Sequence, residues 1–125
     1  MSITTKAHVW VGKFPSENAL HQYFEEQYDM QAGPINRFAA DQQIHWYDHD
    51  WAERIFHKNL SPLEAVLYHG YFDDVRDAIR TSIEAKEISD INATVMLLEE
   101  ELETGLDAAG EAYQLIYLGK FKALV

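Results

Sequence analysis

The chain has 125 residues, of which 21 are acidic and 10 basic, and its formal net charge is −11. This length fits a single domain over residues 1–125, and the absence of cysteine excludes disulfides, thiol catalysis and thiolate metal sites. The negative charge disfavours nucleic acid and membrane surfaces as partners, because it repels phosphate groups. The short apolar run behind Met1–Lys6 is too brief for a signal peptide, so we expect a soluble cytoplasmic protein.

The beginning of the chain predicts one strand and two helices. Residues 7–14, AHVWVGKF, are rich in strand formers and end at Pro15, which predicts a first strand. Ser16 then fits an N-cap, and apolar residues at helical spacing predict a helix from Glu17 to about Tyr28. A second, short helix is predicted over residues 36–43.

The stretch Ile44–His57, IHWYDHDWAERIFH, has two Trp, one Tyr, one Phe, three His, two Asp and one Glu in fourteen positions. We expect it to be extended through about Tyr47, and then helical from a cap at Asp48 or Asp50. Aromatic rings supply large apolar area with a polar group, while His and Asp supply charge and ligand atoms. A core anchor, a partner-binding surface and a metal site are therefore all to be weighed here.

The second half of the chain opens on a clear helix start. Ser61 is a predicted N-cap, followed by Pro62 at the first helical position and by Glu64, three residues after the cap, which completes a capping box. Gly70 should end this helix. A further amphipathic helix is predicted over residues 72–87.

Strand patterns return at the end of the chain. Residues 92–99 form a continuous apolar run, which predicts a central strand covered on both faces. An acidic connection over residues 99–111 leads to a last strand over residues 113–121. We therefore predict an α+β fold, with a small, mostly antiparallel sheet that joins the N-terminal strand to a C-terminal hairpin, and with several helices packed on one face.

A metal site is one interpretation of the central stretch, because His45 and His49 stand four residues apart and would converge on one face of a helix. His57 and nearby carboxylates at Asp41, Asp48 and Asp50 add further ligand types. However, Trp46-Tyr47-Asp48 stand where a general-base Glu would be expected, and this segment looks extended. Histidines of this kind are more often surface groups, or core groups hydrogen-bonded to carboxylates. We assign no metal ligand and no cofactor.

Enzymatic catalysis is weakly supported by the residues. The chain has no nucleophile elbow, no Walker loop and no GxGxxG motif. Asp48 and Asp50, two apart in an extended segment, would point the same way and could act as an acid–base pair, but only within a cleft. We therefore predict no catalytic residues.

Partner binding fits the composition of the stretch better, because Trp, Tyr and charged residues side by side are typical anchors of protein interfaces. The alternative for Trp46 and Trp51 is that each simply fills the core. The predicted partner-binding residues are Trp46, Tyr47, Asp48, His49, Asp50, Trp51 and Glu53.

Four segments resemble the Imm22 family, the predicted immunity proteins of bacterial polymorphic toxin systems. They are HVWVGKF, FAADQQIHWYDHDW, SPLEAVL and YLGKF, and the resemblance covers most of the chain. It implies a cytoplasmic α+β protein, encoded beside a toxin, that binds and blocks the effector domain of that toxin. It carries over no catalytic motif.

The acidic charge agrees with that implication, because a toxin that attacks nucleic acid is commonly basic and carboxylates can occupy the places of phosphates. We expect Asp48, Asp50 and Glu53, joined by Glu99–Glu103, to form part of an inhibitory face. Two alternatives stay open at this point: a small metal- or carboxylate-dependent enzyme centred on residues 45–57, and a general acidic protein-interaction domain.

Overall fold

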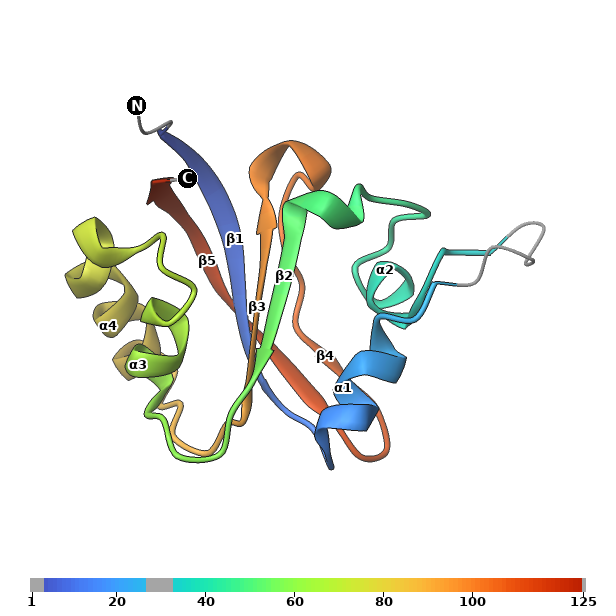
Figure 1. The fold of residues 1–125 in the computed structure, drawn as a ribbon, viewed down its shortest axis with the longest axis horizontal. Coiled ribbons are helices and arrows are strands. Elements are labelled where there is room, and N and C mark those ends of the chain that lie inside the picture. Colours follow the sequence, from blue (N-terminus) through green and yellow to red (C-terminus); the bar gives the residue numbers. More distant parts are fainter. Residues whose placement is uncertain (1–3, 27–32, 125) are drawn as a thin grey trace.

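A five-stranded antiparallel sheet with strand order β2-β3-β1-β5-β4 forms the centre of the protein (Figure 1). The computed structural model describes residues 4–26 and 33–124. The strands are β1 (Thr4–Lys13), β2 (Ala52–Phe56), β3 (Ala93–Leu98), β4 (Ala108–Ala109) and β5 (Gln114–Leu124). The helices are α1 (Glu17–Tyr23), α2 (Arg37–Asp41), α3 (Pro62–Leu67) and α4 (Arg76–Ala85), with 3₁₀ turns η1 (His49–Trp51), η2 (Asp73–Val75) and η3 (Glu99–Glu101). The predicted α+β class is confirmed.

Strand β1 holds the sheet together, because it pairs with β3 on one side and with β5 on the other. In this register Trp10 lies between Val95 of β3 and Tyr117 of β5. The pairing with β5 shifts between Val9 and Trp10, next to Gly119, whose φ of +139° is a conformation open to glycine. The prediction that the N-terminal strand joins the C-terminal strands is therefore confirmed, but β3 and β5 do not form a hairpin with each other, because β1 lies between them.

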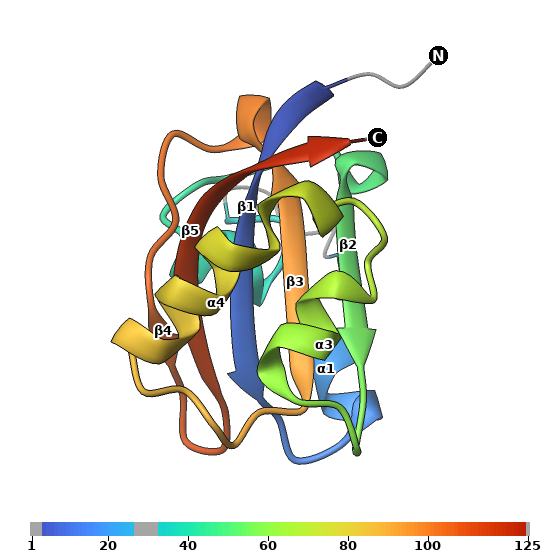
Figure 2. The same cartoon turned by 90° about the vertical axis from the view of Figure 1, so that its left-hand side faces the viewer.

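Helices cover both faces of the sheet, so the expectation that they pack on one face is wrong. Helices α1 and α2 lie on one side of the sheet, and α3 and α4 lie on the other (Figures 1 and 2). All six residues of β3 are buried. Since successive side chains of a strand point to opposite faces, a strand buried at every position requires a layer on each side. Two cores result, one around Trp10 and Phe38 and one around Phe72 and Ile79.

The helix starts follow the predicted caps. The side chain of Ser61 accepts a hydrogen bond from the N–H of Glu64, whose carboxylate accepts in return from the N–H of Ser61, which completes the capping box. Helix α1 ends at Tyr23, earlier than expected, and Tyr28 lies outside the described residues. Within residues 4–26 and 33–124, no helix is both long and apolar enough to cross a membrane.

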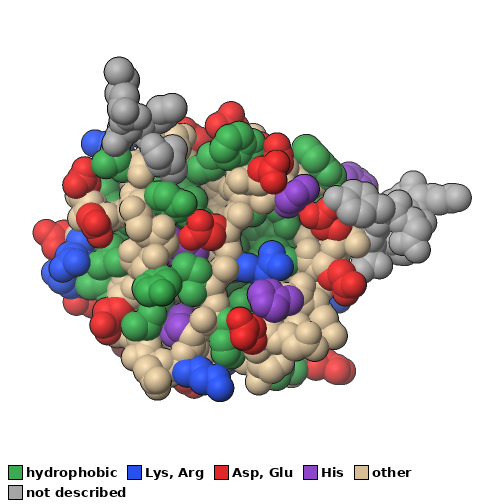
Figure 3. All heavy atoms as spheres, in the orientation of Figure 1, with side chains coloured by type: hydrophobic (Ala, Val, Ile, Leu, Met, Phe, Trp, Pro, Cys, Tyr) green, Lys and Arg blue, Asp and Glu red, His purple; other side chains and the backbone are tan. Residues whose placement is uncertain are grey.

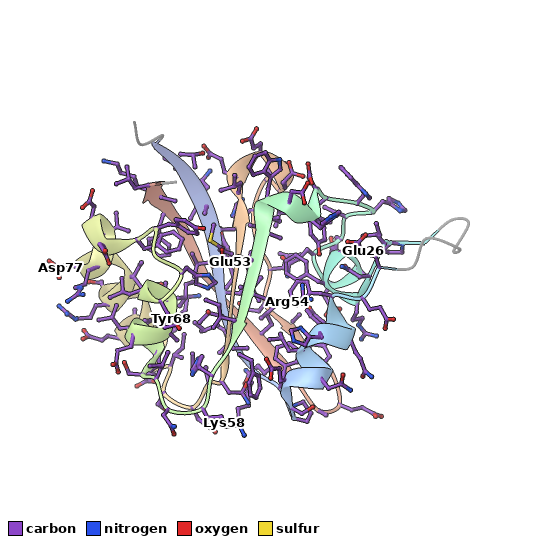
Figure 4. The ribbon with its side chains drawn as sticks, viewed as in Figure 1. Glu26, Glu53, Arg54, Lys58, Tyr68 and Asp77 are labelled. Carbon is purple, nitrogen blue, oxygen red and sulfur yellow. The ribbon has the colours of Figure 1, made fainter. Side chains whose placement is uncertain are left out.

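Residues 52–56, predicted to be helical, form the edge strand β2. Glu53 and Arg54 lie on opposite sides of this strand (Figure 4), as the alternation of a strand requires. The pairing with β3 runs from Ala52 opposite Leu97 to Phe56 opposite Ala93. This pairing satisfies the outer backbone groups of β3, which a helix at this place would leave unpaired. Pairing with β3, which the local sequence pattern does not indicate, thus decides the secondary structure of residues 52–56.

Candidate functional site

The turn η1 and its flanks lie at one end of the sheet, directly before β2 (Figure 1). The predicted cap at Asp48 is present, because its carboxylate accepts a hydrogen bond from the N–H of Asp50 at 3.0 Å. The N–H of Asp48 in turn donates to Oε1 of Glu101 at 2.6 Å. The acidic turn η3 therefore lies against η1, although 53 residues separate the two bonded residues.

Two tryptophans of this segment are exposed to solvent. Trp46 is 60% and Trp51 50% exposed, so neither of them fills the core. His49 is also exposed and lies between Glu26 and Asp50, with its Nδ1 3.3 Å from Oε1 of Glu26 and its Nε2 3.4 Å from Oδ1 of Asp50. On the face seen in Figure 3, acidic side chains are interspersed with hydrophobic ones. We call Trp46, Asp48, His49, Asp50 and Trp51 the η1 surface.

Tyr47 differs from its neighbours because it is only 4% exposed. Its ring meets Phe38 edge-on, with 5.6 Å between the ring centroids. Its hydroxyl accepts a hydrogen bond from the side-chain amide of Asn36 at 2.9 Å, and burial raises its pKa. Tyr47 is a core residue on the α2 side of the sheet, so its prediction as a partner-binding residue is wrong.

Replacing this hydroxyl tests that placement. We expect Tyr47→Phe to lower the free energy of unfolding by about 1 kcal/mol, because a buried hydrogen bond is lost while the ring packing stays. The Asn36 amide keeps its second acceptor, the carbonyl of Phe24. Urea denaturation measures the change, and Tyr68→Phe at an exposed position serves as the control with no expected loss. Equal stability of the two variants would contradict the assignment.

Glu53 lies on the α3 side of the sheet, where it meets two residues that the sequence pattern did not single out. Its Oε1 is 2.7 Å from Nδ1 of His69, and its Oε2 accepts a hydrogen bond from the hydroxyl of Tyr71 at 3.2 Å. The nearby carboxylate raises the pKa of Tyr71. Glu53 also lines a hollow of about 150 Å³ together with Asp50 and Trp51, so the structure does bring it beside the η1 surface.

A carboxylate, an imidazole and a hydroxyl follow one another in this cluster, because Nε2 of His69 lies 2.7 Å from the hydroxyl of Thr94. This order is reminiscent of a hydrolase triad. However, Thr94 is 0% exposed in the middle of β3, so its hydroxyl is closed to a substrate. Burial lowers the pKa of His69, and a neutral ring that donates to Glu53 and accepts from Thr94 satisfies all three groups. The cluster is a network that supports the fold, in which His69 and Thr94 are buried and the Glu53 side chain is 38% exposed.

Among residues 4–26 and 33–124, one group of three side chains could hold a metal ion. Asp48, His49 and Asp50 each offer a ligand atom within 4.8 Å of the others. His45 and His57 do not join them, because residues 45–48 are not helical and His57 is buried at the end of β2. The carboxylate of Asp48 already caps η1.

The remaining candidate ligand, Asp41, makes hydrogen bonds elsewhere in the protein. Its Oδ2 accepts hydrogen bonds from the hydroxyls of Tyr23 and Tyr113, at 2.8 Å and 2.5 Å. Arg37, one turn earlier on α2, donates to its other oxygen. These contacts span as many as 72 residues, and no spacing in the sequence pointed to them.

Three buried histidines make the stability of the protein sensitive to acid. Burial lowers the pKa of His8, His57 and His69 below the ordinary value of 6.5. The unfolded chain therefore takes up protons near pH 6.5 that the folded chain refuses until a lower pH is reached. Stability contributed by these groups is fully present above about pH 7 and is lost as the pH falls, by up to about 1.4 kcal/mol per pH unit for each histidine.

We expect the free energy of unfolding to fall between pH 7 and about pH 5.5, a window that lies above the ordinary range of carboxylate titration. Urea denaturation at several pH values measures the slope. The ring nitrogens of His57 have no hydrogen-bond partner among the described residues, so His57→Leu serves as the comparison and should reduce the slope. Constant stability of the wild type across this window would contradict the assignment of neutral histidines.

A family model described as "Immunity protein 22" matches residues 7–122 of the chain. No curated protein and no solved structure matches this chain. The matched residues include the whole η1 surface and strand β2.

Proposed function

This chain belongs to the Immunity protein 22 family, and from that premise we propose that it binds the effector domain of a cognate bacterial toxin and blocks it by forming a stoichiometric complex. Family membership supports an immunity function. The proposal adds that the protein acts by binding alone and that the η1 surface contacts the toxin. The exposed pair Trp46 and Trp51, set among carboxylates, is the observation that carries it.

The exposure of these two rings supports a binding role. Trp is enriched at interface hot spots because one ring buries a large area and brings a hydrogen-bond donor. Buried Trp10 shows what the fold needs from such a ring, since it is fully covered and donates its indole N–H to the carbonyl of Leu106. By contrast, half or more of Trp46 and Trp51 is left in water, where the apolar area stays available to a partner.

The charge beside the two rings favours a basic partner. Asp48 and Asp50 lie next to η3, which consists of Glu99, Glu100 and Glu101. Of these, Glu99 has a nearby cation, Lys120, at 3.4 Å. Complementary charge raises association rates by about 10-fold to 1000-fold at low salt. A toxin that acts on nucleic acid fits this surface, because carboxylates can lie where its phosphate ligands would bind.

Protection of growing cells tests the proposed function. The effector domain of the toxin whose gene neighbours this one is expressed in a bacterial host, with and without this chain. We expect co-expression to restore growth, and an unrelated acidic domain of similar charge to give no protection. Persistent growth arrest with both proteins soluble in the cell would contradict the proposal for this toxin.

A further inference from the structure

Strand β2 is the last strand on its side of the sheet, and its outer backbone faces away from the described strands. The N–H of His57 donates to the carbonyl of Asn92 at 2.7 Å, which fixes the alternation of the antiparallel pair. Glu53 and Ile55 then exchange hydrogen bonds with β3, and the backbone groups of Arg54 and Phe56 point outward. Within residues 4–26 and 33–124, no other strand pairs with this edge.

This edge has two charged side chains, Glu53 and Arg54, and both are held against the protein. Strand edges are commonly shielded by charged side chains that hinder pairing with another chain. Both charges of β2 are folded back onto the protein, Glu53 by His69 at 2.7 Å and Arg54 by His21 at 3.1 Å. The Arg54 guanidinium also lies 5.1 Å from the centre of the Phe24 ring. Figure 4 shows the two side chains on opposite sides of the strand.

The opposite edge of the sheet offers much less. It is formed by β4, which has only two residues and pairs only with the beginning of β5. Beyond β4, backbone groups of β5 at Tyr117, Leu118 and Leu124 are already hydrogen-bonded to Asp107, Ser82 and Tyr71. A pairing partner gains few backbone hydrogen bonds from this edge. Strand β2, with five residues, is therefore the edge that can accept an extended segment.

A hollow beside β2 indicates the chemistry of that segment. It measures about 150 Å³ and has Met96 and Leu98 as apolar walls, with the carboxylates of Asp50 and Glu53 and the ring of Trp51 at its border. The aliphatic stem of a Lys or Arg fits such walls, while its cation meets the carboxylates and the indole. A strand added outside β2 would lie about 5 Å away, within reach of a long side chain.

We propose that the toxin's effector domain adds an extended segment to the free edge of β2 and places a Lys or Arg side chain in this hollow. This inference rests on the proposed function and specifies how the partner binds. A second copy of this chain fits the edge poorly, because each copy has a net charge of −11. Antiparallel pairing centred on the middle of β2 would also set Arg54 opposite Arg54, and like charges directly opposite are destabilising.

Residue-resolved amide hydrogen exchange of the full chain, free and bound to the effector domain, tests this pairing. We expect the amides of Arg54 and Phe56 to exchange at least about tenfold more slowly in the complex, because they gain hydrogen-bond acceptors. The amides of Glu53 and Ile55 already face β3 and serve as internal controls that change less. A stable complex with unchanged exchange at Arg54 and Phe56 would overturn the inference and leave the proposed function intact.

Two substitutions at one position separate backbone from side chain. Arg54→Pro removes the outward N–H and is compatible with an edge strand, whereas Arg54→Ala keeps the N–H and removes only the side chain. We expect Arg54→Pro to bind at least about tenfold more weakly than Arg54→Ala. Equal affinities of two folded variants would overturn the inference. If Arg54→Pro does not fold, the exchange experiment on the wild type decides.

The remaining outcomes are also distinct. Failure of the wild-type chain to bind this effector domain would count against the proposed function itself. Protection of Arg54 and Phe56 already in the free protein, together with a dimer in sedimentation, would identify a second copy of the chain as the occupant and overturn the inference.

Discussion

The variant Trp46→Ala/Trp51→Ala is expected to lose most of its affinity for the toxin's effector domain. Truncation of a hot-spot tryptophan costs about 2–4 kcal/mol of binding free energy, which corresponds to roughly 30-fold to 1000-fold in the dissociation constant. The two losses need not add, because neighbouring hot spots are coupled. Isothermal titration calorimetry with the purified effector domain measures the change.

The fold should tolerate this variant, because both rings are largely in solvent and surface substitutions usually change stability by about 0.5 kcal/mol or less. Leu124→Ala is a matched control, since it truncates another exposed hydrophobic side chain near the end of β5. We expect Leu124→Ala to bind as the wild type does. Unchanged affinity of the double tryptophan variant would remove the η1 surface from the interface.

The second large effect is expected from the charge of the η1 surface. In Asp48→Asn/Asp50→Lys, the asparagine can still cap η1, because its side-chain oxygen can accept the hydrogen bond from the backbone N–H of position 50. The negative charge beside the two rings is reversed. We expect binding about 10-fold to 100-fold weaker at low salt, mostly through slower association, and a smaller difference as salt screens the charges.

The control for this variant is Glu84→Lys/Glu87→Gln. It changes the net charge by the same amount at two exposed positions near the C-terminal end of α4, which lies away from η1 (Figure 2). We expect this variant to bind with little change at physiological salt. Stopped-flow association rates at two salt concentrations distinguish the variants. Equal losses for both would show that total charge, and not the η1 surface, governs the encounter.

Local signals in the sequence predicted much of the fold. The capping box at Ser61 and the caps at Ser16 and Asn36 act within three residues, and all three are present. The continuous apolar run that predicted a strand over residues 92–99 became the fully buried strand β3. Such features depend on hydrogen bonds and burial that neighbouring residues largely determine.

The failures have one physical cause, which is contact over long sequence distances. Residues 52–56 have no strict alternation, and pairing with β3 some forty residues later makes them a strand. Helices are needed on both faces of the sheet because all six residues of β3 are buried. Tyr47 and Trp46 are adjacent aromatic residues, and only the packing of Phe38 decides which of them is buried.

The candidate site was predicted in part. The segment 46–51 does expose two aromatic rings and several charges, and Glu101 of the later acidic run does contact Asp48. The hollow beside Glu53 could not be predicted, because Tyr71 reaches it from one distant part of the chain and Met96 and Leu98 reach it from another, strand β3. Assignment of these residues to an interface remains a prediction that the variants above address.

The central claim, that this protein neutralises its toxin by occupying it, is tested most directly by titrating the activity of a fixed amount of purified effector domain with the wild-type chain. When the toxin concentration is well above the dissociation constant of the complex, we predict that toxin activity falls linearly and reaches zero at one molecule of this chain per effector domain. Complete loss of activity at a small fraction of that ratio would show turnover by an enzyme, and full activity at molar excess would show no inhibition. Either result would contradict the account.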